Sequence, residues 1–242
     1  GINSFTVWTP DGERMTFHSR RGGVGGIYWK RADGSGESEP LVLAGKVGEM
    51  FAPNSWSPDG NTLVFQRLSS TKADIRSDLW IANSEGDREP LPLVAAGALE
   101  SGAAVSPDGR WLAYKSNESG GYEIYVQPFP GGGERHQISA DWALPPVWSP
   151  DGRTIYYSDA RWGRHIMAVS VSTVPRFRTE APRVLFEAEY ETGYYLTHPN
   201  FDIAPDGKSF VMVKPDEEWG RATEIRVILN WFEELECLSP PN

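Results

Sequence analysis

The sequence is poor in cysteine and in basic residues, and both shortages exclude classes of protein. Its 242 residues include one cysteine, Cys237, so no disulfide can form within the chain. The 23 lysines and arginines are outnumbered by 33 aspartates and glutamates, which leaves a formal net charge of -10. A surface of that sign argues against a nucleic-acid backbone or an anionic lipid surface as the partner.

Long apolar stretches and the familiar catalytic motifs are missing as well. No run of about 18 apolar residues occurs, so we expect no membrane insertion by this chain. There is no Gly-x-Ser-x-Gly elbow and no His-Glu-x-x-His zinc motif. The glycine-rich stretch 22–26 lacks the spacing of a dinucleotide-binding loop. The sequence therefore contains none of the common hydrolase, zinc or dinucleotide signatures.

What the sequence does contain is an internal repeat centred on the tripeptide Pro-Asp-Gly. Its five copies, each with the residue before the proline, are 9–12, 57–60, 106–109, 149–152 and 204–207, and their prolines lie 43 to 55 residues apart. Proline presets one backbone angle, aspartate can bond the backbone downstream, and glycine accepts a positive φ. We therefore predict five tight turns, with Gly60, Gly109 and Gly152 at positive φ.

Short runs rich in aromatic and β-branched residues flank every turn. Residues 103–105 precede the third turn and 112–114 follow it, with a third run at 123–126 and a weaker fourth at 137–138. Four antiparallel strands in about 45 to 50 residues are the unit of a β-propeller blade. We predict an all-β protein, a β-propeller of five four-stranded antiparallel blades. A β-sandwich is the alternative, but it does not require identical four-strand units.

The repeats predict one domain, residues 1–242, without a linker. The five blades would cover about 1–48, 49–97, 98–140, 141–193 and 194–242. We expect blade 1 to pack against blade 5 to close the ring, with 230–236 as the outer element of blade 5. Trp8, Trp56 and Trp148 share one repeat position, so we expect all three to pack between blades.

The Trp-Ser-Pro-Asp-Gly sequences at 56–60 and 148–152 resemble the TolB-type, WD40-like propeller repeat of bacteria. The stretches 116–133 and 229–235 also resemble the C-terminal extracytoplasmic propeller of bacterial serine/threonine kinases. These resemblances imply a module that binds a protein or small ligand, in a periplasmic or other extracytoplasmic location. They transfer no catalytic residue, because the kinase motifs His-Arg-Asp and Asp-Phe-Gly are absent.

Five aromatic residues are candidates for a ligand-binding surface. If the Pro-Asp-Gly turns follow the innermost strands, the loops on the opposite face converge on the central channel. Those loops carry Trp142, Trp162, Tyr194, Tyr195 and Trp219. Aromatic side chains are favoured anchors at interfaces. Packing of each ring over a blade end is the other interpretation.

Polar residues near the ends of the innermost strands suggest a second kind of site. Asn3, Glu100 and His198 each lie seven residues before a repeat proline, and Asn200 lies five before one. Oxygen ligands with negative charge suit Ca²⁺. In this interpretation Asn3, Glu100 and Asn200 bind the ion, while His198 is a ligand or a general base. The other interpretation is that these side chains hold ordered water.

Two functions therefore stay open at this point. The first is a non-enzymatic propeller that binds a protein or small ligand around the channel. The alternative is a Ca²⁺-type metal-dependent hydrolase or lactonase that acts on esters, lactones or phosphoesters at the channel mouth.

Overall fold

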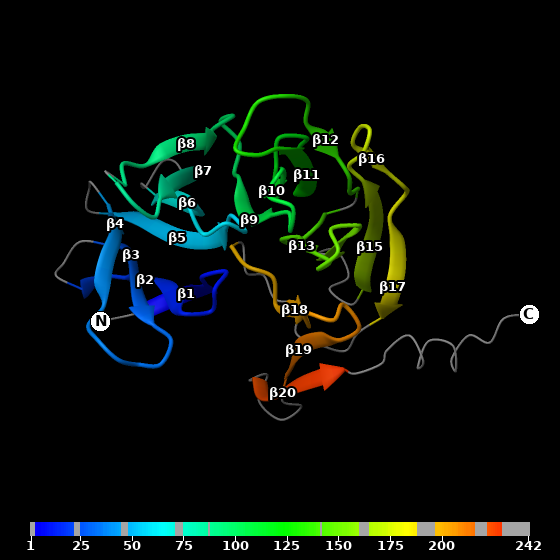
Figure 1. The fold of residues 1–242 in the computed structure, drawn as a ribbon. Helices are drawn as coiled ribbons and strands as arrows, with labels where there is room; N and C mark the ends of the chain where they lie inside the picture. Colours follow the sequence, from blue (N-terminus) through cyan, green and yellow to red (C-terminus); the bar gives the residue numbers. More distant parts are fainter. Residues whose placement is uncertain are drawn as a thin grey trace, which may run out of the picture.

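A computed structural model describes residues 3–21, 25–44, 48–70, 75–86, 88–140, 142–159, 165–187, 197–215 and 222–228. These residues form five antiparallel sheets, and no α-helix occurs among them. The sheets are arranged around a common centre, as blades of a propeller (Figure 1). The predicted all-β propeller of five blades is confirmed.

The first three blades each contain four strands in sequence order. Blade 1 consists of β1 (Asn3–Trp8), β2 (Arg14–Ser19), β3 (Gly26–Arg31) and β4 (Glu39–Leu43). Blade 2 consists of β5 (Glu49–Trp56), β6 (Thr62–Ser70), β7 (Ile75–Asn83) and β8 (Leu91–Val94). Blade 3 consists of β9 (Ser101–Val105), β10 (Trp111–Ser116), β11 (Glu123–Pro128) and β12 (His136–Gln137). In each, the first strand is innermost (Figure 1).

The last two blades depart from the four-strand pattern. Blade 4 consists of β13 (Val147–Trp148), β14 (Thr154–Ser158), β15 (His165–Ser172), β16 (Arg178–Thr179) and β17 (Arg183–Glu187). Both β16 and β17 pair with β15, because β15 is long enough to carry two short partners along one edge. Blade 5 has three described strands, β18 (Phe201–Ile203), β19 (Phe210–Pro215) and β20 (Ala222–Ile228). Its expected outer element, 230–236, lies outside the described residues.

The Pro-Asp-Gly turns are locked by the hydroxyl residue that precedes the proline. In the second turn, Ser57 Oγ donates to Asp59 Oδ1 at 2.5 Å and accepts from Thr62 N at 2.9 Å. The Ser57 hydroxyl and then the Asn61 amide lower the pKa of Asp59. The first, third and fourth turns repeat this arrangement.

The turn glycines have the predicted left-handed backbone. Gly60, Gly109 and Gly152 have φ of 73°, 70° and 69°. The turns of neighbouring blades also touch, since a Cβ on Gly109 would lie 3.4 Å from Cδ of Pro58. An L side chain at these positions would therefore be strained by the backbone.

Two of the repeat tryptophans fasten their blade to the preceding blade. Trp56 is 6% exposed and its Nε1 donates to Thr16 Oγ1 at 3.3 Å. Trp148 is 7% exposed and its Nε1 donates to the Ala104 carbonyl at 3.1 Å. Apolar side chains around each indole form the cores between blades 1 and 2 and between blades 3 and 4. The sequence prediction is confirmed for both residues.

The prediction is wrong for Trp8, which is 56% exposed. In a closed ring its indole would cover the second strand of blade 5. Six residues after its repeat proline, blade 5 carries Val211, where blade 1 carries Thr16. Valine has no hydroxyl to accept the indole N–H. Trp148 is nevertheless buried beside Ala113, at the equivalent position of blade 3, so the missing hydroxyl alone does not account for the exposure of Trp8.

The fifth turn provides an internal control for the hydroxyl lock, because it begins with Ala204. We expect Ser106→Ala to lower the free energy of unfolding by about 1–2 kcal/mol, since it removes bonds to Asp108 and to the Trp111 amide. Ala204→Ser should raise it by about 0.5 kcal/mol. Urea unfolding followed by circular dichroism measures both changes. If both substitutions changed the free energy of unfolding in the same direction, this role of the hydroxyl would be contradicted.

Candidate functional site

The innermost strands of blades 1, 2 and 3 are interrupted by β-bulges at corresponding places. The pairing of β1 shifts between Ser4 and Val7, and Phe5 adopts a φ of 59°. The pairing of β5 shifts between Pro53 and Ser55. In β9, Gly102 has a φ of 59°. A bulge removes backbone groups from the strand ladder, so these strands can present polar backbone atoms to the channel.

A segment of blade 5, residues 197–200, uses these backbone atoms. We call it the crossing segment, because it reaches β5 of blade 2 before the chain enters β18 (Figure 1). Asn54 Nδ2 donates to the Thr197 carbonyl at 3.2 Å, and His198 Nε2 donates to the Pro53 carbonyl at 2.7 Å. The His198 ring also stacks on Phe5 with centroids 5.3 Å apart. The Phe5 residue with the left-handed backbone therefore contacts the crossing segment through its ring.

The Pro53 hydrogen bond defines the protonation of His198. A carbonyl oxygen only accepts, so Nε2 carries the proton and Nδ1 is an acceptor. Burial lowers the pKa of His198, against the opposing effect of the Pro53 bond, so the ring is neutral at pH 7. His198 Nδ1 and Asn54 Oδ1 are both buried without a hydrogen-bond partner among the described residues. Two unpaired acceptors thus lie at the crossing segment.

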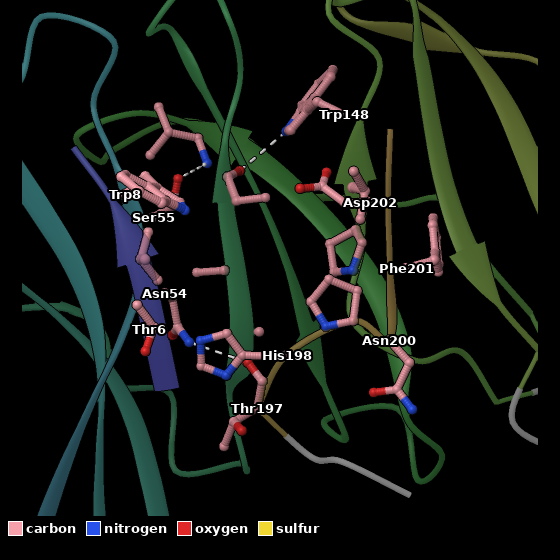
Figure 2. A pocket seen from close by; sticks show the side chains of 18 of the residues that line it. Thr6, Trp8, Asn54, Ser55, Trp148, Thr197, His198, Asn200, Phe201 and Asp202 are labelled. Atoms are coloured by element: carbon pink, nitrogen blue, oxygen red, sulfur yellow. Dashed lines mark hydrogen bonds between the residues drawn. The ribbon is translucent and has the colours of Figure 1, made fainter. Parts of the chain in front are cut away.

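The crossing segment borders a cavity of about 750 Å³ at the centre of the propeller. Residues from the innermost strands of all five blades line it, together with Val211 and Val213 of β19. Trp8, Trp148, His198 and Asp202 lie around the same cavity in Figure 2. Pro58 and Pro107 also belong to the lining, so the cavity extends to the Pro-Asp-Gly turns. This volume is within the usual range of ligand pockets.

Asp202 is the one charged side chain among the described residues that line this cavity, if His198 is neutral. It follows Phe201, which is buried against blade 4, so the alternation of β18 turns Asp202 away from that core. Asp202 pairs with Val211, which places both on the same face of blade 5. The surrounding walls desolvate the carboxylate and raise its pKa.

The family model of the TolB β-propeller domain matches residues 35–191. The chain belongs to the TolB β-propeller family. TolB of Acinetobacter baumannii shares the fold with a TM-score of 0.67 and 17% identity, over 95% of this chain and 52% of that one. A puromycin-hydrolysing peptidase of Mycobacterium tuberculosis shares the fold with a TM-score of 0.62 and 20% identity. The match covers 88% of this chain and 35% of that one.

A relative by sequence is dipeptidyl-peptidase 5 of Porphyromonas gingivalis, 26% identical over 132 residues. The match covers 50% of this chain and 19% of that protein. The stretches that match the curated relatives therefore cover less than a fifth of the length of those proteins. Among its described residues, no helix is long and apolar enough to cross a bilayer.

The four residues predicted to hold a metal do not line one cavity in this TolB-type propeller. His198 and Asn200 belong to the lining, whereas Asn3 and Glu100 do not. Asn3 lies at the exposed start of β1. Within the described part of the chain, no three Asp, Glu, His or Cys side chains are grouped as metal ligands.

Glu100 instead lies at the junction of blades 2 and 3. Its amide donates to the Ser77 carbonyl at 2.8 Å, and Ser77 Oγ donates to its carbonyl at 2.6 Å. The side chain is fully buried, and neither carboxylate oxygen has a well-aligned hydrogen-bond partner among the described residues. Burial, together with the nearby Asp78 carboxylate, raises the pKa of Glu100 to about 7.

Of the five predicted aromatic residues, only Trp142 is among the described residues. It is 45% exposed, adopts a φ of 67°, and meets the Tyr122 ring edge-on with centroids 5.7 Å apart. It does not belong to the cavity lining. Trp162, Tyr194, Tyr195 and Trp219 lie outside the described residues.

Sequence reasoning missed Asn54, Asp202 and Lys115. Asp202 had a visible signal, since it is a charge between two apolar residues of an innermost strand. Lys115 had none: it is fully buried, and its Nζ lies 4.7 Å from the Tyr122 ring centre with no described hydrogen-bond partner. Burial lowers the pKa of Lys115 to about 8. Asp202 and Lys115 show that the alternation of side chains along a strand predicts which residues face inward. It does not predict whether a long side chain such as that of Lys115 is fully buried.

The raised pKa of Glu100 predicts a specific pH dependence of stability. The folded state keeps the Glu100 proton up to about pH 7, whereas an unfolded glutamate loses it near its ordinary value of 4.5. This stabilisation is complete below pH 4.5 and is lost as pH rises through 7. Glu100→Gln should therefore be more stable than the wild type at pH 8, by up to roughly 3 kcal/mol.

Urea unfolding at pH 5 and pH 8 measures this difference. Glu37→Gln, at an exposed position, serves as the control and should keep the wild-type pH dependence. A Glu100→Gln protein whose stability changes with pH as the wild type does would show that Glu100 is not protonated in the fold.

Proposed function

We propose that this TolB-type propeller is a non-enzymatic binding module that accepts a segment of another protein in its central cavity. The observation that carries the proposal is the cavity itself, which is lined by all five blades and bordered by exposed Trp8. Apolar walls with a few convergent polar groups are typical of binding sites. A small molecule is the second class of ligand that such a cavity suits.

The relatives support a binding role for the propeller part. Dipeptidyl-peptidase 5 and the puromycin-hydrolysing peptidase are peptidases by name, and this chain matches 19% and 35% of their lengths. This chain contains no nucleophile elbow. We propose an extracytoplasmic location in keeping with the kinase-type resemblance. Trp142, with Trp162, Tyr194, Tyr195 and Trp219, is a further candidate for partner contact on the opposite face.

The alternative, a Ca²⁺-dependent hydrolase, is favoured by one observation. Glu100 has a fully buried carboxylate without a described hydrogen-bond partner, and a cation-binding side chain would show the same feature in the absence of its cation. Against it, Glu100 and Asn3 do not belong to the cavity lining that contains His198 and Asn200. His198 Nε2 is also held by the Pro53 carbonyl. We therefore place the binding module first.

Filling the cavity separates the two functions. Val211→Trp adds bulk on the cavity wall, and Val184→Trp makes the same change at a 52% exposed position on the outer strand β17. On an array of random nonapeptides, we expect the wild type and Val184→Trp to retain the same binders and Val211→Trp to lose them. Circular dichroism checks that both variants are folded.

The same three proteins are then tested with ester, lactone and phosphoester substrates, with Ca²⁺ or EDTA. Peptide binding without turnover supports the binding module. Turnover that chelation abolishes would overturn it in favour of the hydrolase, and an array without binders would overturn it outright.

A further inference from the structure

The central cavity is bordered by blade 1 and by blade 5. Thr6 and Trp8 of β1 form one side, and Asp202, Val211 and Val213 of blade 5 form the other. We call this the seam cleft. All five residues line the cavity, and all are partly or fully exposed. The corresponding space between blades 3 and 4 is instead filled by Trp148 and its core.

The residue in the place of Asp202 has a defined role elsewhere in the propeller. Three residues before the repeat proline, blade 2 has Ser55 and blade 3 has Ala104. Ser55 Oγ accepts from the Val105 amide of the next blade at 3.1 Å, and the Ala104 carbonyl accepts from Trp148 of the next blade. These positions therefore contact the following blade, and blade 5 has a carboxylate there.

The Asp202 carboxylate needs a cationic partner if another protein group is to bind over it. An unpaired charge enclosed by packed protein would cost several kcal/mol, so a group that covers Asp202 must pair with its carboxylate. None of the described residues that line the cavity is lysine or arginine, and no described charge shifts the pKa of Asp202. Among the described residues, its carboxylate accepts a hydrogen bond from the neighbouring Ile203 amide.

The other polar groups of the cavity are also acceptors. His198 Nδ1 and Asn54 Oδ1 lack donors among the described residues, and both residues line the same cavity as Asp202 (Figure 2). Trp8 adds an exposed indole, whose face attracts cations. A carboxylate, unpaired acceptors and an indole all select a ligand that is positively charged and rich in hydrogen-bond donors.

We propose that the seam cleft binds a lysine side chain of the partner protein, with its ammonium group at Asp202 and its methylene chain between Trp8 and Val211. A lysine side chain has a positively charged donor group at the end of an apolar stem, which matches the Asp202 carboxylate and the apolar walls of the cleft. This inference rests on the proposed function, because it names the chemistry of the segment that the cavity accepts.

The probes are acetylated and amidated nonapeptides of alanine and serine, each with one central residue: lysine, acetyl-lysine or glutamate. Calorimetry should show that the lysine peptide binds roughly tenfold or more tightly than the acetyl-lysine peptide, since a hydrogen bond to a charged group is lost. Asp202→Asn should remove this preference. Glu37→Gln, which changes the net charge equally at an exposed position, should keep it.

A second variant covers the case in which Asp202→Asn does not fold. Thr6→Lys places a fixed cation in the cleft from the opposite side, and it should abolish binding of the lysine peptide. If peptides bind but lysine and acetyl-lysine are equivalent, or the preference survives in Asp202→Asn, this inference is overturned and the binding module stands. If no peptide binds on the array, the proposed function fails, and this inference fails with it.

Discussion

The packing of each blade onto the one before it is the interaction on which the rest of the propeller depends, and at two of the junctions an indole provides it. At Trp56 and Trp148 the ring is buried and its N–H reaches an acceptor on the preceding blade. Both rings belong to the apolar cores between the blades, so burial and hydrogen bonding act at the same place. Trp8, at the same repeat position, is 56% exposed. Its indole lies at the lining of the central cavity.

Much of the fold could be predicted because its causes are local and repeated. A Pro-Asp-Gly turn requires a left-handed glycine wherever it occurs, and each strand pair follows from the turn between its strands. The crossing segment could not be predicted in this way. His198 contacts Pro53 across 145 residues of chain, and the carbonyl is available only because β5 is bulged. The surroundings of Glu100 and Lys115 likewise come from other segments, Ser77 of blade 2 and the Tyr122 ring.

The candidate site was predicted in part for the same reason. Counting back from the repeat proline selected four residues, of which His198 and Asn200 line the cavity and Asn3 and Glu100 do not. The count could not tell that Glu100 lies at the junction with Ser77 of blade 2. Asp202 is distinguished by comparison with Ser55 and Ala104, whose contacts with the next blade appear only in the structure. The repeat thus provides a set of equivalent positions, and the departures from it mark the site.

The central claim is that the opening between blade 5 and blade 1 is a binding site for a cationic side chain. A crystal structure of the protein with the lysine nonapeptide tests this most directly. The account predicts the lysine ammonium within about 3 Å of the Asp202 carboxylate, with the stem against Trp8. A peptide bound on the opposite face beside Trp142, or a seam cleft filled by a further sheet or a second copy of the chain, would contradict it.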